Sequence, residues 1–244
     1  MKCSFERWAK VVPVLVALLG GAVTSHAMPI KPVSYNMTNG YGTAVGGEYN
    51  YWDGNYNGSV GFNTINGNPV KDGGSLTGGL GALTDNIIAT RDWENGLNTV
   101  ENFAGTGPYV GWTWGDPTIT FNFASAVKIA SMTFYVDNPA LAHGGVAAPK
   151  SFTIGTLGNN LDYLVDTAHL ATGPVPISFS GLGLDTQNVT VTINRNVSDS
   201  SFWVFLSEVT FDDGMPTPVP EPSTLLLFGA GLAGATLLWK RRTV

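Results

Sequence analysis

Residues 118–136, TITFNFASAVKIASMTFYV, decide the fold of this chain. Apolar residues stand at every second position in the first six and the last five residues of the stretch. They are Ile119, Phe121, Phe123, Met132, Phe134 and Val136. Successive side chains of a β-strand point to opposite faces, so this alternation predicts two strands that each bury one face.

Two later segments repeat the pattern. In NVTVTI, residues 188–193, the alternating apolar residues are Val189, Val191 and Ile193. FWVFLSEVTF, residues 202–211, places Phe202, Val204 and Leu206 on one face, and the phase then shifts near Ser207. Such a shift predicts a β-bulge. Trp203, inside this strand, is expected to serve packing.

The rest of the chain offers turns rather than helices. Glycine is dense over residues 39–81, which predicts short strands joined by tight turns. The best helical candidate is 83–97, LTDNIIATRDWENGL, with a turn or two. Strands separated by Gly, Pro and Asn predict an all-β fold, a β-sandwich of the jelly-roll kind, over residues 28–213.

Charge and cysteine content exclude several functions. Residues 28–219 hold six Lys or Arg and sixteen Asp or Glu, a formal charge of −10. Such a surface is unsuited to nucleic acid. The one cysteine, Cys3, lies in the leader described next, which excludes disulfides, thiolate catalysis and cysteine metal sites from the mature protein.

The first 27 residues have the features of a secretory signal peptide. Lys2, Arg7 and Lys10 precede an apolar stretch over 11–23. Small residues before Met28 predict cleavage by signal peptidase between Ala27 and Met28. A membrane anchor is the alternative, although the apolar stretch is short for one.

The last 31 residues divide into three parts: a Pro-rich linker at 214–222, an uncharged stretch at 223–239 and a basic end at 240–244. As a helix, 17 residues would reach about 26 Å, which barely spans a bilayer core of about 30 Å. Lys240, Arg241 and Arg242 are expected to stay in the cytoplasm, with the folded domain outside. A permanent single-pass anchor and a GPI signal are the alternatives.

This end resembles the PEP-CTERM sorting signal of Gram-negative bacteria that make exopolysaccharide. The resemblance rests on the motif Val219, Pro220, Glu221, Pro222 and Ser223, followed by the apolar stretch and the basic end. It implies recognition by an exosortase, a membrane transpeptidase thought to cleave near Pro-Glu-Pro. The protein would reach the inner membrane transiently and then the cell envelope or the extracellular matrix, without 225–244.

An enzyme is not expected. Two histidines remain outside the signal peptide, His143 and His169, both in loop-like sequence. The chain has no G-x-S-x-G, no H-E-x-x-H and no phosphate-binding glycine loop. Carboxylates are numerous, but no spacing singles out the pair that a glycosidase needs.

Within the core, LTDNIIATRDW, DPTITFNFASAVKIASMTFYV and FLSEVTF together resemble the discoidin or coagulation-factor C-type family. The resemblance covers residues 80–213 and implies a jelly roll of the galactose-binding-like superfamily. Asn86 stands where the family often has Gly, and the terminal cysteines of many members are missing. Asn tolerates a left-handed backbone.

The resemblance also implies candidate binding residues. Calcium, which some members bind in the early loop, would be held by Asp85 and Thr90, and the alternative for Asp85 is a turn-forming Asx motif. Members that bind sugars use loops at one end of the sandwich. Aromatic residues near turns are therefore sugar-stacking candidates, with core packing as the alternative for each. They are Tyr51, Trp52, Trp93, Tyr109, Trp112 and Trp114.

The sequence therefore predicts an exported, noncatalytic module that binds the polysaccharide of the cell's own matrix. The alternative is a structural surface protein that associates with itself through its glycine-rich and aromatic segments. A secreted hydrolase is a third reading, for which the sequence indicates no residue.

Overall fold

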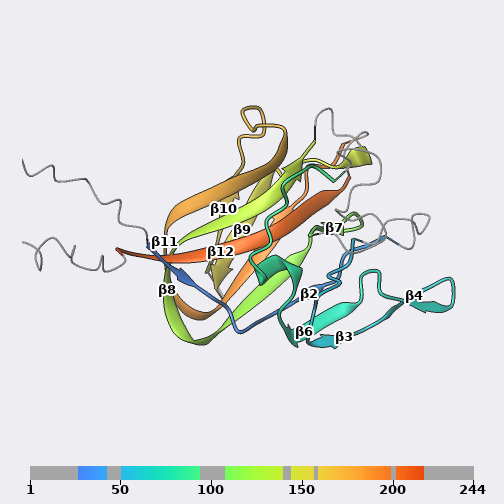
Figure 1. The fold of residues 1–244 in the computed structure, drawn as a ribbon, viewed down its shortest axis with the longest axis horizontal. Helices are drawn as coiled ribbons and strands as arrows, with labels where there is room; N and C mark the ends of the chain where they lie inside the picture. Colours follow the sequence, from blue (N-terminus) through green and yellow to red (C-terminus); the bar gives the residue numbers. More distant parts are fainter. Residues whose placement is uncertain are drawn as a thin grey trace, which may run out of the picture. The chain divides into compact units, whose positions relative to one another are not determined.

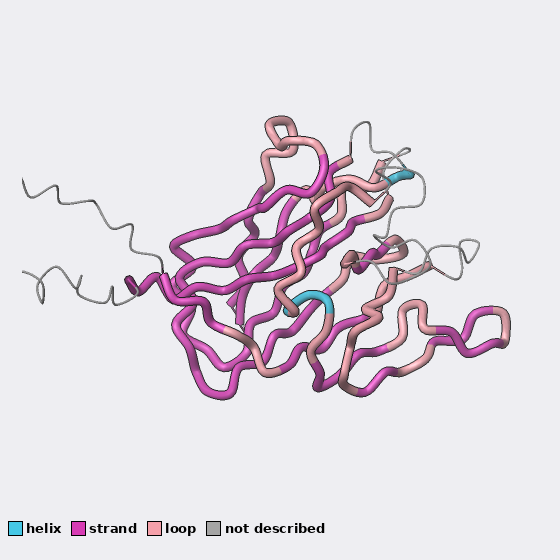
Figure 2. Tube along the Cα trace, in the orientation of Figure 1, coloured by secondary structure: helices cyan, strands magenta, loops and turns pink. Residues whose placement is uncertain are grey.

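The computed structural model describes residues 27–42, 51–93, 108–139, 144–156, 159–198 and 202–216, all within one compact unit from Ala27 to Pro216. Most of this trace is strand (Figure 2). The shorter strands are β1 Ala27–Ile30, β2 Ser34–Thr38, β3 Ser59–Val60, β4 Asn63–Ile65, β5 Asn68–Val70, β6 Ser75–Gly79, β7 Val110–Trp112, β9 Ser151–Thr156 and β10 Asn159–Leu164. The longer strands are β8 Thr118–Asn138, β11 Gly173–Asn194 and β12 Val204–Pro216.

Strands β8 and β11 pair along almost their whole length and belong to both layers of the fold (Figure 1). The two alternating stretches of residues 118–136 are the halves of one bent strand, so the prediction of two separate strands is wrong. Residues between the halves stay paired, with Val127 opposite Thr186 and Lys128 opposite Asp185. Register shifts in β11 near this bend allow the pair to turn from one layer into the other.

The first layer has the strand order β10-β9-β11-β8-β2-β6-β3 and uses the first half of β8 and the second half of β11. In the second layer, the other half of β8 pairs with β12, which in turn pairs with β1 and β7. All these pairings are antiparallel. Two long strands that bend together thus supply the frame of both layers.

Aromatic rings from the two layers meet in the core. Phe121 of the first layer lies 4.9 Å from Phe211 of the second, centroid to centroid, and Phe134 stacks on Phe152 at 4.2 Å. The alternating residues that the sequence singled out in β8 and β11 are at most 2% exposed. The prediction of an all-β sandwich is confirmed.

The last strand contains the predicted bulge. The pairing of β12 with β8 shifts between Leu206 and Glu208, around the buried Ser207. Trp203 is 6% exposed, which confirms its packing role. Phe202, however, precedes the strand and is 42% exposed, so its expected place on the inward face is wrong.

The glycine-rich segment forms short strands and turns, as predicted. Strands β4 and β5 make a hairpin whose turn residues Asn66 and Gly67 have φ of 52° and 79°. Gly40 lies so close to a neighbouring segment that a Cβ there would be 1.8 Å from Tyr51 O. The expected helical turn is the 3-10 turn η2, Ala82–Thr84.

The first and last strands are neighbours, with Ala27 opposite Pro216. β12 therefore extends to residue 216, into the part expected to be linker. The rest of the expected signal peptide and the tail, including Val219 to Ser223 and Lys240 to Arg242, lie outside the described residues. Within the described ranges, no helix is long and apolar enough to cross a membrane.

Candidate functional site: an aromatic loop end

Three of the aromatic sugar-binding candidates are packed inside the protein. Tyr51, Tyr109 and Trp112 are 6%, 0% and 1% exposed. The Tyr51 ring lies 4.5 Å from that of Phe205 and 5.3 Å from that of Trp203. Their faces contact protein, so the sequence-based assignment of these three residues to sugar stacking is corrected to core packing.

Trp52 is half-buried among the glycine-rich turns. Its Nε1 donates to Asp72 Oδ1 at 2.6 Å, and Lys71 Nζ lies 5.4 Å from its ring centroid. A buried carboxylate fixes the edge of the indole, and a cation lies over its ring. Trp52 is therefore anchored rather than freely presented.

Trp93 and Phe202 meet consecutive glycines of one loop. A Cβ on Gly144 would lie 2.1 Å from Trp93 Cζ2, and a Cβ on Gly145 would lie 2.6 Å from Phe202 Cε1. Both glycines have positive φ, 60° and 78°, which other residues rarely adopt. Gly145 O also accepts the backbone N–H of Phe202 at 2.8 Å. Glycine is thus required where this loop passes the two aromatic rings.

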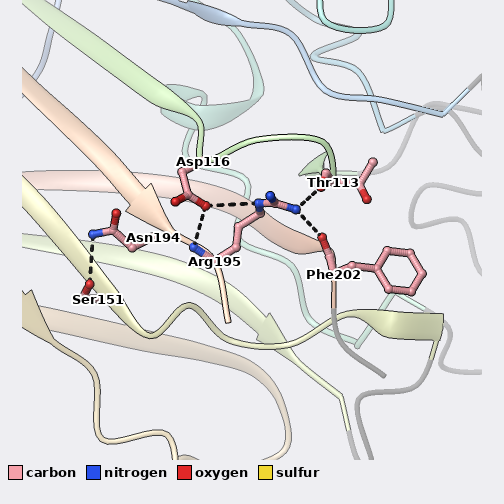
Figure 3. A network of polar contacts seen from close by, with 6 residues as sticks. All are labelled: Thr113, Asp116, Ser151, Asn194, Arg195 and Phe202. Carbon is pink, nitrogen blue, oxygen red and sulfur yellow. Dashed lines mark hydrogen bonds and ion pairs between the residues drawn. The ribbon is translucent and has the colours of Figure 1, made fainter. Parts of the chain in front are cut away.

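Arg195 fastens the Phe202 segment to a second loop (Figure 3). Its Nη1 donates to Phe202 O at 2.6 Å and to Thr113 O, and its Nε donates to Asp116 Oδ1 at 3.2 Å. The backbone N–H of Arg195 donates to the same carboxylate oxygen at 3.0 Å. Only 10% of the Arg195 side chain is exposed. A planar guanidinium with five donors suits such a junction of carbonyls and one carboxylate.

The position of Arg195 follows from the end of β11. Asn194, the last residue of that strand, donates from Nδ2 to Ser151 Oγ at 2.9 Å (Figure 3). The same Nδ2 donates to Thr153 Oγ1 at 3.0 Å. Arg195 comes directly after this fixed point. Sequence reasoning missed Arg195, although a cation directly after an apolar strand, in a segment with few cations, is a signal that could have found it.

The two loops that Arg195 joins carry the exposed aromatic rings of this end. Trp114 follows Thr113 and is 71% exposed, and Phe202 is 42% exposed. Trp114 is the sequence candidate whose ring is most available to a ligand. Trp93, half-buried, contacts Tyr51 and Phe205 edge-on. The aromatic rings that this end of the described structure offers to a ligand are therefore those of Trp114, Phe202 and the accessible part of Trp93.

The proposed calcium residues lie in a separate loop. Asp85 Oδ1 accepts the N–H of Ile87 at 2.9 Å, which is the Asx turn considered from the sequence. Asn86 has a φ of 67°, so asparagine does take the left-handed conformation. Thr90 is exposed. The described residues contain no group of three or more His, Cys, Asp or Glu arranged for a metal.

Glu208 faces the same loop and was missed by sequence reasoning. Its Oε2 accepts the N–H of Asn86 at 2.9 Å. Burial is the main cause that raises the pKa of Glu208 to about 7, and the negative charge of Asp85 adds to it. Lys31 Nζ, bonded to Asn86 Oδ1 at 3.1 Å, acts in the opposite direction.

The histidines offer no catalytic arrangement among the described residues. His169 Nδ1 lies 2.7 Å from Asp166 Oδ2, with side chains 83% and 70% exposed. This confirms a solvated loop for His169, while His143 lies outside the described residues. An exposed pair without a nucleophile beside it gives no reason to assign a reaction.

Comparison with protein families identifies the tail. Residues 218–242 match the model of the PEP-CTERM protein-sorting motif, which confirms the resemblance of the tail. The motif indicates an exported protein, sorted to the envelope of a Gram-negative bacterium. No curated protein matches the chain.

Several solved structures are similar over part of the chain. The family 32 CBM of C. perfringens NanJ in complex with galactose has 14% identity and a TM-score of 0.29, over 42% of this chain and 74% of its own. A structure of the Streptococcus pneumoniae beta-galactosidase BgaA has 15% identity and a TM-score of 0.33, over 54% of this chain and 83% of its own. A chitosan-binding module from Paenibacillus sp. IK-5 has 13% identity and a TM-score of 0.27, over 42% of this chain and 75% of its own. These scores are low, so the likeness says nothing about a ligand of this chain.

Proposed function

We propose that this protein is exported to the cell envelope or extracellular matrix, where it binds exopolysaccharide at its aromatic loop end without catalysing a reaction. The sorting motif at 218–242 supports export and processing by an exosortase. Signal peptidase would first remove residues 1–27. The folded part that remains, Met28 to Pro216, would then be the functional module.

One observation carries the binding proposal. Nη1 of Arg195, whose side chain is 10% exposed, donates to the backbone carbonyls of both Thr113 and Phe202. Two loops that carry exposed aromatic rings are thereby fixed to the same side chain. Aromatic faces stack on the apolar faces of sugar rings, and fixed rings lose less conformational entropy on binding than mobile ones. Asp116, 41% exposed beside them, adds a hydrogen-bond acceptor.

Calorimetry tests this proposal. The full chain, in a polyoxyethylene detergent that carries no sugar, is titrated with exopolysaccharide from the producing organism and with short oligosaccharides made from it. We expect saturable binding that Trp114→Ala weakens at least tenfold. Phe62→Ala, which removes a ring that is 64% exposed on another part of the chain, is the matched control. Equal affinity of the two variants would show that the loop end is not the exopolysaccharide-binding site.

Calcium is a second, separate part of the proposal. Asp85 and Glu208 bring carboxylate oxygens, the ligand type that calcium prefers, to one loop, and Thr90 adds a hydroxyl to it. A calcium ion there would neutralise two nearby negative charges and so stabilise the loop. The melting temperature should rise on addition of calcium, fall with a chelator, and not respond in Asp85→Ala. A lack of response in the parent protein would remove calcium from the proposal.

A structural protein that associates with itself is the second candidate, favoured by one edge of the first layer. In the described part of the chain, β10 pairs with β9 alone, and it exposes Leu161 by 57% and Leu164 by 83%. Exposed apolar edge strands can pair with another chain. Sedimentation at increasing protein concentration separates the candidates. Oligomers that disappear in Leu161→Lys, together with no affinity for exopolysaccharide, would favour the structural protein.

A further inference from the structure

The outer face of the first layer consists of hydroxyl and amide side chains. Its inward residues are the buried apolar ones of β2, β6, β8, β9 and β11, so the alternate residues point outward. From β3 to β9, apart from Gly78, Gly155 and Ala124 at the bend of β8, these outward residues are all Ser, Thr or Asn. They are Ser34, Asn36, Thr38, Ser59, Ser75, Thr77, Thr118, Thr120, Asn122, Ser151, Thr153, Asn188, Thr190, Thr192 and Asn194.

These side chains form rows across the strands, which we call the hydroxyl face. Thr118 Oγ1 lies 2.9 Å from Thr192 Oγ1, and Thr192 is opposite Thr153 on the next strand. In the neighbouring row, Thr120 Oγ1 lies 3.4 Å from Thr190 Oγ1. Adjacent strands are about 4.8 Å apart and successive outward residues about 6.7 Å apart, so the groups make a regular grid.

The hydroxyl face carries no charged side chain and no large apolar one between β3 and β9. Solubility favours a surface in which about 25–35% of the residues are Lys, Arg, Glu or Asp. The second layer differs, because its outward positions include Tyr135, Pro176 and Asp212 beside the hydroxyl pair Thr133 and Ser178. The composition of the hydroxyl face is thus a property of the strands from β3 to β9, and it ends at the edge strand β10, where Asp162 accepts from Thr153 and Leu164 is exposed.

We propose that the hydroxyl face is a second binding surface, for an extended neutral polysaccharide chain. A hydroxyl group donates one hydrogen bond and accepts two, so the paired threonines keep capacity for a ligand of the same chemistry. An acidic polymer would meet the formal charge of −10 of residues 28–219, whereas a neutral polymer is not repelled. This surface is distinct from the loop end and does not depend on it.

Sheet twist decides which form of polysaccharide fits. Neighbouring strands rotate by about 20° each, so the six strands of the hydroxyl face turn through roughly 100°. A flat crystalline lattice cannot follow that turn, but a single flexible chain can. Each neutral hydrogen bond contributes little to binding, because it replaces a hydrogen bond to water. Binding should therefore need a polymer that contacts several rows and should be undetectable for a disaccharide.

Affinity electrophoresis of the full chain in polyoxyethylene detergent tests the proposal. The gels contain hydroxyethyl cellulose, galactomannan or dextran as neutral polymers, and alginate as the anionic comparison. We expect at least one neutral polymer to retard the protein and alginate not to do so. Thr120→Lys with Thr190→Lys should reduce the apparent affinity at least tenfold. Thr133→Lys with Ser178→Lys, the same change on the second layer, should leave it unchanged.

A second pair of substitutions distinguishes loss of binding from misfolding of the lysine variant. Thr120→Val with Thr190→Val removes the hydroxyls but keeps the side-chain shape and strand preference, and should also abolish retardation. Retardation that persists in this variant, or no retardation of the parent by any neutral polymer, would overturn the proposal. So would retardation lost in Trp114→Ala, which would place the polymer at the loop end and leave the proposed function standing.

Discussion

The carboxylate of Glu208 accepts a hydrogen bond of 2.9 Å from the backbone N–H of Asn86, which lies 122 residues earlier in the chain. This bond ties the bulge of β12 to the loop that follows η2. The carboxyl group is buried, and Asp85 lies close enough for its charge to raise the pKa of Glu208. The last strand thus carries a group that titrates near neutral pH.

The first prediction concerns stability against pH. The pKa of Glu208 is raised from 4.5 to about 7 in the folded protein. Glu208 therefore binds its proton more tightly in the folded state than in the unfolded state. Its contribution to the free energy of unfolding is complete below pH 4.5 and is lost as pH rises through 7. The loss should be on the order of 1 to 3 kcal/mol. Urea unfolding with a chelator present, at pH 5 and pH 8, measures it.

Glu208→Gln is the matched variant for this experiment. Its amide oxygen can still accept the Asn86 N–H but does not ionise, so the variant should lose less stability between the two pH values. Asp53, whose pKa burial also raises, contributes a loss of the same sign in both proteins. The prediction fails if the two proteins show the same dependence on pH.

The second prediction concerns the loop junction. Arg195→Met keeps the volume of the stem but leaves the carbonyls of Thr113 and Phe202 without their donor. The free energy of unfolding should fall by about 1.5–3 kcal/mol, as for hydrogen bonds to a charged group. Affinity for exopolysaccharide should also fall, because the rings of Trp114 and Phe202 lose their fixed positions. Urea unfolding and calorimetry measure the two effects.

Asp116→Asn is the control for the junction. Its amide oxygen can still accept from Arg195, and the residue is 41% exposed, so the loss of the charge should cost about 1 kcal/mol or less. An effect of Asp116→Asn as large as that of Arg195→Met would mean that the ion pair, rather than the carbonyl contacts, holds the loops.

The third prediction concerns the contact between layers. Phe211 meets both Phe121 and Phe123, at 4.9 and 5.3 Å between ring centroids. Phe211→Ala should lower the free energy of unfolding by about 3–5 kcal/mol, because it removes a buried ring and leaves a cavity. Phe62→Ala, at an exposed position, should change it by less than about 0.5 kcal/mol. Similar midpoints in urea for the two variants would contradict the two-layer core.

The fourth prediction concerns a glycine. A Cβ at Gly40 would lie 1.8 Å from Tyr51 O and 2.8 Å from Gly111 O, both backbone atoms that cannot rotate away. Gly40→Ala should therefore destabilise the protein by about 3 kcal/mol or more. At Gly115 no atom lies within 4 Å, so Gly115→Ala should be neutral or slightly stabilising. Thermal unfolding of both variants tests whether close approach is the cause.

The sequence predicted the strands well because their signal is local. Alternation in β8 and β11 identified buried residues such as Phe121 and Val191, and the phase shift in β12 located the bulge at Ser207. The bend of β8 was missed because Ala124, Ser125 and Ala126 interrupt the pattern while the strand continues. Periodicity along one chain does not report that two strands turn together.

The site was predicted less well, since it depends on contacts that are distant in sequence. Arg195 donates a hydrogen bond to the backbone carbonyl of Thr113, 82 residues earlier, and no sequence pattern predicts a contact over that distance. Because both Trp112 and Trp114 lie near a turn in the sequence, the sequence predicted both as sugar-stacking residues. The structure buries the first and exposes the second, because only Trp112 belongs to β7 and faces the core.

The pairing of β1 with β12 has a practical consequence for the engineering of this protein. Since Ala27 lies opposite Pro216, a short linker could join the two ends of the folded unit. New ends could then be opened between Asn66 and Gly67, at the exposed tip of the β4–β5 hairpin. A circular permutant of this kind would keep both layers intact and free the module from its tail.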